Sequence, residues 1–138
     1  MGEIGSEKIA QGKMAEQEAR RYFQSKGYEL FQVDWIVLNP DTGEYVLVEV
    51  KGQEHYKAPP FDGHGLPKWQ IDARLAFEER TGIKAFLFIV DTGTGIIYGE
   101  WLRALEEGEH YDTKGEKPRR IYPLSNFGMR RSSCECES

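Results

Sequence analysis

The chain has 138 residues, of which 39% are apolar, 30% charged and 12% aromatic. This is the size and composition of a single globular domain, and it excludes a largely disordered chain. The formal net charge of −5 means that no overall positive field marks the chain as a polyanion binder. No apolar run approaches the roughly 20 residues of a membrane-spanning helix. We therefore expect no membrane partner and a cytoplasmic location.

Residues 7–26 predict an amphipathic helix. Small and aromatic side chains recur at helical spacing (Ala15, Ala19, Tyr22 and Phe23), and charged residues surround this stripe. Ser6 is a suitable N-cap, and Gly27 supplies the left-handed conformation that often ends a helix.

An antiparallel hairpin is predicted next. Residues 28–38 and 44–51 are rich in aromatic and β-branched residues, and the intervening Asn-Pro-Asp-Thr-Gly is turn sequence. If the hairpin is symmetric about the Asp41–Thr42 bond, Ile36 pairs with Leu47. Asp34 then lies opposite Glu49.

This register would bring two carboxylates together. Strand side chains alternate between faces, so Glu49 and Lys51 share a face, and paired Cβ atoms lie roughly 4.5–5.5 Å apart. Close carboxylates repel each other, and a hard divalent cation such as Mg²⁺, Mn²⁺ or Ca²⁺ relieves the repulsion. The alternative is that Asp34 and Glu49 are solvated on an exposed sheet face, with Lys51 pairing one of them.

The next segment, residues 52–67, shows no periodicity and predicts a long loop. Its two histidines, His55 and His64, lie near Asp62 in sequence, and we expect ordinary loop residues rather than ligands of a substrate or a metal. Trp69 and Trp101 are expected to anchor helices or the core rather than to stack on bases.

The second half of the chain predicts alternating helices and strands. Residues 68–81 predict a helix ended by Gly82, and residues 84–90 form an apolar run typical of a buried strand. Residues 96–99 are expected to pair back, and a short helix follows at 101–107. If the strands at 44–51 and 84–90 are parallel, the crossover through the helix should be right-handed.

The C-terminal part combines a basic segment with a polar tail. Residues 114–131 hold six cations against one anion, which suits either nucleic acid approaching one side or a solvated loop. We expect a single domain over residues 1–131 and a flexible tail over 132–138. Cys134 and Cys136 lie in this tail and cannot build a disulfide framework.

These elements resemble the PD-(D/E)XK nuclease superfamily. The resemblance rests on Asp34, on Glu49-Val50-Lys51 after a fifteen-residue spacing, and on Lys68-Trp69-Gln70 at the following helix. Residues 12–19 (GKMAEQEA) resemble the first helix of archaeal Holliday-junction resolvases. The residue before Asp34 is Val33, where the superfamily usually has proline. The resemblance implies an α/β, restriction-endonuclease-like core, α-β-β-(β)-α-β, with a central mixed sheet flanked by helices.

The resemblance also implies a function: a divalent-metal-dependent endonuclease that hydrolyses DNA, with structured DNA as one substrate class and RNA left open. It implies Mg²⁺, with Mn²⁺ as a substitute, and a homodimer as one form of assembly. The implied metal ligands are Asp34, Glu49, the Val50 carbonyl and Glu16, while Lys51 and Gln70 complete the catalytic set. The cations expected to hold DNA phosphates are Lys13, Arg20, Lys68, Lys117, Arg119 and Arg120.

Two other functions are compatible with parts of the sequence. A non-catalytic nucleic-acid-binding or assembly module on the same fold is the main alternative. Asp-Thr-Gly occurs at Asp41 and again at Asp91, which superficially resembles the catalytic turns of aspartic proteases. The second copy leaves only 45 residues for a protease lobe, and Asp, Thr and Gly are ordinary turn residues. This disfavours the protease.

Overall fold

The computed structural model describes the backbone of residues 2–30 and 34–132, and the side chains of residues 11–30 and 34–132. The chain forms two compact units, residues 1–32 and residues 33–138. In the first, the helix α1 (Gly2–Ser25) confirms the predicted N-terminal helix and starts earlier than predicted. Gly27, at φ +84°, follows it, and the Tyr28 N–H donates to the Phe23 carbonyl at 3.0 Å.

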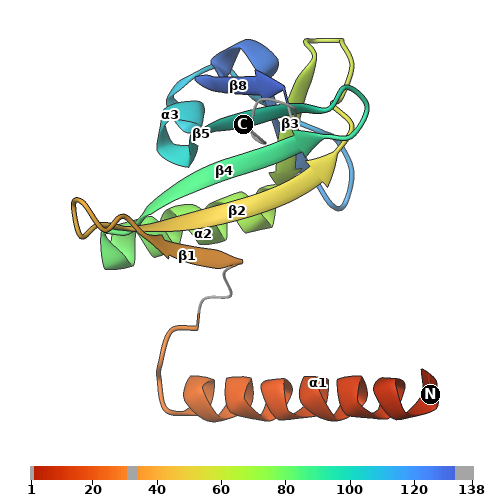
Figure 1. Cartoon of the computed structure of the whole chain (residues 1–138), viewed down its shortest axis with the longest axis vertical. Helices are drawn as coiled ribbons and strands as arrows, with labels where there is room; N and C mark the ends of the chain where they lie inside the picture. Colours follow the sequence, from red (N-terminus) through yellow and green to blue (C-terminus); the bar gives the residue numbers. More distant parts are fainter. Residues whose placement is uncertain (1, 31–33, 133–138) are drawn as a thin grey trace. The chain divides into compact units, whose positions relative to one another are not determined.

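The second unit contains a five-stranded mixed sheet (Figure 1). The sheet order is β1 (Trp35–Leu38), β2 (Tyr45–Gln53), β4 (Lys84–Asp91), β5 (Ile96–Trp101) and β8 (Met129–Ser132). β2 and β4 are parallel, and the other neighbours are antiparallel. β1 is shorter than the predicted strand, which was expected to start at Tyr28.

Helix α2 (Lys68–Thr81) connects the two parallel strands and packs on one face of the sheet (Figure 1). Both of its bounds agree with the prediction, and it ends at Gly82, whose φ is +76°. Ile71 and Phe77 of α2 are buried, as are the residues of the sheet face it covers: Leu47, Glu49, Ala85, Leu87 and Ile89. The polar members of this interface form the candidate site.

The remaining segments correct the prediction of irregular structure. β3 (Gly63–Pro67) pairs with β7 (Arg119–Pro123), which also pairs with β6 (Tyr111–Asp112), in a second, three-stranded sheet. The helix α3 (Leu102–Glu107) lies between β5 and β6, and the short 3₁₀ helix η1 (Leu124–Asn126) precedes β8. β3 was missed because a Gly-His-Gly-Leu-Pro strand lacks the β-branched alternation that marks strands.

The observed element order, α1-β1-β2-β3-α2-β4, confirms the predicted α/β class with a central mixed sheet. Residues 132–138 were expected to be a tail. Ser132 instead ends β8, and residues 133–138 with both cysteines lie outside the described residues. Within residues 2–30 and 34–132, no helix has both the length and the hydropathy needed to span a bilayer.

Candidate functional site

Glu49 is the centre of the candidate site. It lies on β2, where strand alternation turns its side chain toward α2, and it is only 2% exposed. Its Oε1 accepts a hydrogen bond from the Gln70 amide at 2.6 Å, and its Oε2 accepts one from Arg74 Nε at 2.8 Å. Gln70 and Arg74 stand one turn apart on α2, so they reach the same carboxylate from one helix face. The carboxylate is therefore held in a single orientation.

Lys51 lies two residues further along the same face of β2. Its Nζ is 3.5 Å from Glu49 Oε1, and its side chain is 32% exposed. The predicted sharing of one face by Glu49 and Lys51 is confirmed by this contact. The ammonium thus lies between a buried carboxylate and the solvent.

Asp34 lies at the edge of this group. The predicted hairpin register is confirmed from Trp35, opposite Val48, to Leu38, opposite Tyr45, and Asp34 immediately precedes these pairs. Its Oδ2 accepts a long hydrogen bond from the Val50 N–H at 3.4 Å. The exposed carboxylate of Asp34 therefore lies beside the residue that joins Glu49 to Lys51.

For the other predicted site residues, the structure gives exposure and local contacts. Glu16, Lys13 and Arg20 are exposed on α1, in the first unit, and their roles stay predictions. Lys68 Nζ forms an ion pair with Asp72 at 3.0 Å, and Lys117 is exposed. Arg119 lies over the Tyr56 ring, 5.8 Å from its centroid.

Arg120 does not have the free guanidinium that phosphate binding would use. Its Nε and Nη2 donate to Asp112 at 2.7 and 3.0 Å, and its Nη1 donates to Glu106 at 2.7 Å. These carboxylates raise the pKa of Arg120, chiefly because Asp112 accepts hydrogen bonds from it. The arginine thus braces β7 against β6 and α3, which disfavours the predicted role in holding DNA.

The expectation for the tryptophans was wrong for Trp69. It is 70% exposed in the first turn of α2, next to Gln70. Trp101 is 38% exposed and packs edge-on against Phe86, with ring centroids 5.3 Å apart. Trp69 lies in α2, whereas Trp101 ends β5 instead of starting a helix as predicted. Local sequence pattern does not predict their exposure, because the tertiary structure decides what covers each side chain.

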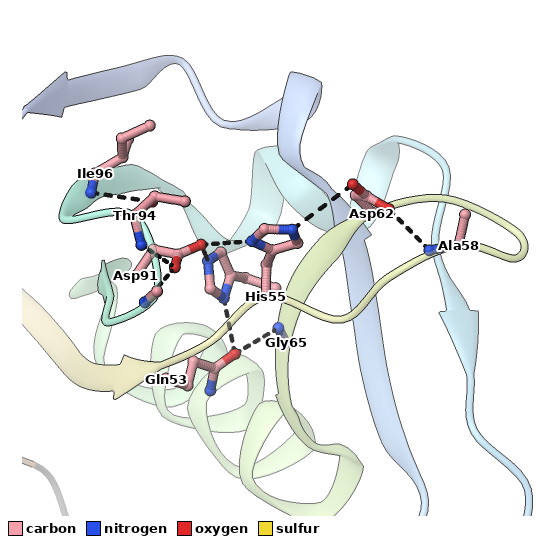
Figure 2. Close-up of polar contacts among 10 residues, drawn as sticks. Gln53, His55, Ala58, Asp62, Gly65, Asp91, Thr94 and Ile96 are labelled. Atoms are coloured by element: carbon pink, nitrogen blue, oxygen red, sulfur yellow. Dashed lines mark hydrogen bonds and ion pairs between the residues drawn. The ribbon is translucent and has the colours of Figure 1, made fainter.

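A second polar cluster joins the segment after β2 to the end of β4 (Figure 2). Asp91, fully buried, is hydrogen bonded through Oδ2 to His55 Nδ1 at 2.8 Å and to His64 Nε2 at 3.0 Å. Its Oδ1 accepts the N–H groups of Gly93 and Thr94. Asp62 Oδ2 lies 3.7 Å from His55 Nε2. The histidines are therefore tied into the fold instead of lying free in a loop.

Burial and hydrogen bonding shift two pKa values in this cluster. Desolvation lowers the pKa of His64 below its usual 6.5, although Asp91 beside it opposes that shift. Burial alone would raise the pKa of Asp91, but the hydrogen bonds from His55, Gly93, His64 and Thr94 outweigh it and lower that pKa below 3.8. Asp91 is thus a structural carboxylate at neutral pH, and this second Asp-Thr-Gly forms a turn.

Arg74 is the residue of the site that sequence reasoning missed. Its position four residues after Gln70 was a usable signal, because residues i and i+4 share a helix face. Only the packing of α2 on β2 shows that this face meets Glu49.

Comparison with known proteins finds likenesses among solved structures. A scan against family models and a search of curated proteins both find no match. Among solved structures, the chain is similar to Hjc, a Holliday junction resolvase from Archaeoglobus fulgidus, with 14% sequence identity and a TM-score of 0.46. The superposition covers 80% of this chain and 84% of the resolvase.

Proposed function

We propose that this chain is a divalent-metal-dependent endonuclease that hydrolyses phosphodiester bonds in DNA. The observation that carries the proposal is the convergence of Gln70 and Lys51 on the buried carboxylate of Glu49. Asp34 adds a second, exposed carboxylate beside Val50. Burying a carboxylate costs desolvation free energy, which a sheet with a purely structural role would avoid by using apolar residues. Buried ionisable groups with polar partners are often found at functional sites.

The donor set suits a hard cation. The carboxylates of Asp34 and Glu49 and the Val50 carbonyl would hold it, because Mg²⁺ and Mn²⁺ prefer oxygen ligands. Within the described part of the chain, no three His, Cys, Asp or Glu side chains are grouped to hold a metal ion. Water and phosphate oxygens would therefore supply the remaining ligands. When bound, the ion polarises the phosphate and lowers the pKa of a coordinated water.

Each protein group has a separate task in this proposal. Lys51 stabilises negative charge that develops on the phosphate oxygens, since its side chain is 32% exposed and can reach a bound phosphate. Gln70 keeps Glu49 Oε1 in place through its amide N–H. Asp34 would contribute the exposed carboxylate of the ligand set.

The test is a cleavage assay on plasmid, four-way junction and single-stranded DNA, with Mg²⁺ or Mn²⁺ against a chelator. Lys51→Ala should lower cleavage by about a hundredfold or more while the circular dichroism spectrum stays unchanged. Lys84→Ala is the matched control, because Lys84 is an exposed lysine of the same sheet at the opposite end of the parallel pair. It should cleave like the wild type.

Equal cleavage by wild type and Lys51→Ala would contradict the proposed endonuclease function. Binding of DNA without cleavage under any of these conditions would instead favour the non-catalytic module. One observation is compatible with that alternative: both Glu49 oxygens are already occupied by partners within the protein. If a junction is the preferred substrate, a two-fold homodimer is expected, because that substrate is itself two-fold.

A further inference from the structure

The negative charge of Glu49 is already balanced by Arg74. The two side chains are 3% and 6% exposed, and Arg74 Nε lies 2.8 Å from Glu49 Oε2. An ion pair so poorly hydrated is strongly coupled, and removing either partner leaves an uncompensated charge. Lys51, 3.5 Å from the other oxygen, adds a second positive charge.

The whole candidate site is therefore neutral before any metal ion arrives. Asp34 and Glu49 supply two negative charges, and Lys51 and Arg74 supply two positive ones. The affinity of a protein site for a hard divalent cation increases with the number of negatively charged ligands. A neutral set of this kind attracts a dication weakly, although its oxygen atoms are the right donors.

We propose that Arg74 sets the cation affinity of this site: it is a built-in counter-charge that keeps divalent-cation binding weak until a DNA phosphate brings additional negative charge. The inference rests on the proposed function and adds its order of assembly. Gln70 already orients Glu49 through the other oxygen. The distinctive contribution of Arg74 is thus its charge rather than its hydrogen bond.

Thermodynamic linkage makes this coupling reciprocal. If DNA raises the affinity for the cation by some factor, the cation raises the affinity for DNA by the same factor. Weakening the counter-charge should raise the cation affinity of the free protein and reduce the additional gain from DNA. If Arg74 has only a structural role, its substitution should change the stability of the protein and leave the affinities for the cation and for DNA unchanged.

Isothermal titration calorimetry with Ca²⁺ and Mn²⁺ tests the proposal directly. Arg74→Gln keeps a hydrogen-bond donor but loses the charge, and we expect it to bind the cation at least about tenfold more tightly than the wild type. Arg74→Lys keeps the charge and should stay near the wild-type affinity. Arg103→Gln is the control, since Arg103 Nε also pairs with a carboxylate, Glu78 Oε2 at 3.0 Å, that is not part of the candidate site, although Arg103 is more exposed than Arg74. The Arg103→Gln variant should bind Ca²⁺ and Mn²⁺ with the wild-type affinity.

A second measurement needs no variant. The Ca²⁺ affinity of the wild type is compared with and without a DNA duplex, and we expect at least about a tenfold gain with DNA. This comparison decides the question if Arg74→Gln does not fold, as judged by circular dichroism. Equal affinities with and without DNA, or a folded Arg74→Gln with unchanged affinity, would overturn the role of Arg74 and leave the proposed nuclease intact. No cation uptake under any condition, together with no cleavage, would reject the nuclease itself.

Discussion

At the scale of single residues, the unusual feature of the second unit is how many polar side chains it buries. Glu49, His64, Gln70, Arg74 and Asp91 are all buried, and each has a partner. They form two separate groups on the same parallel pair of strands: one around Glu49, and one around Asp91, which is opposite Gln53 at the end of that pair. Polar groups are tolerated in a core only when they are paired in this way.

His64 should be essential for stability. It is fully buried between Gln53 and Asp91, so His64→Ala leaves a cavity and removes a partner from a buried carboxylate. We expect a loss of about 3 kcal/mol in the free energy of unfolding, measured by urea denaturation. His110→Ala is the control, because the His110 side chain is 29% exposed and it should cost well under half as much. Similar losses for the two variants would contradict the network.

The same cluster predicts how stability depends on pH. The pKa of His64 is lower in the folded protein than the usual 6.5, so the unfolded chain binds a proton first as the pH falls. The free energy of unfolding should therefore decrease as the pH drops from about 6.5 toward the folded pKa. The pKa of Asp91 is also lowered, so its contribution is present above 3.8 and is lost as the pH falls further. Urea titrations at several pH values should show the first step in the wild type and not in His64→Ala.

At the scale of elements, glycine allows the second sheet to form. β3 lies so close to β7 that a Cβ on Gly65 would collide with the Arg120 carbonyl, and one on Gly63 with the Tyr122 carbonyl. The strand can approach its neighbour only because these side chains are absent. β7 in turn carries Arg120, which ties the sheet to α3 through Glu106.

A pair of glycine variants tests this interpretation. Gly65→Ala should lower the melting temperature by several degrees, because the backbone of β7 must move to admit the methyl group. Gly12→Ala, within α1, meets no atom within 4 Å. It should leave stability unchanged or raise it by about 0.5–1 kcal/mol through helix propensity. Differential scanning calorimetry measures both, and an unaffected Gly65→Ala would refute the close approach.

At the scale of the whole molecule, the acidic chain must bind a polyanion if the proposed function is correct. The basic segment offers two exposed lysines for this role, whereas Arg120 is paired within the protein. Lys114 and Lys117 are exposed between β6 and β7.

The double variant Lys114→Ala/Lys117→Ala should therefore weaken DNA binding and reduce its dependence on salt. Each lost phosphate contact lowers the slope of log affinity against log salt by roughly one. Fluorescence anisotropy with a labelled duplex at several salt concentrations measures this slope. A slope identical to the wild type would place the DNA elsewhere on the molecule.

The sequence alone determined the parts that depend on local pattern. It predicted α2 with its glycine stop, the hairpin register from Trp35 to Leu38, and the common face of Glu49 and Lys51. Spacing along one strand or helix is enough for these, because a period of two or of 3.6 residues fixes which side chains share a face.

Tertiary structure alone decided what meets each face. It brought Arg74 to Glu49 and both histidines to Asp91, and it left Trp69 exposed. The partners of these contacts lie 25 to 36 residues apart in the chain. The docking of α2 on β2 and the joining of the segment after β2 to β4 create them, and no local period encodes either event.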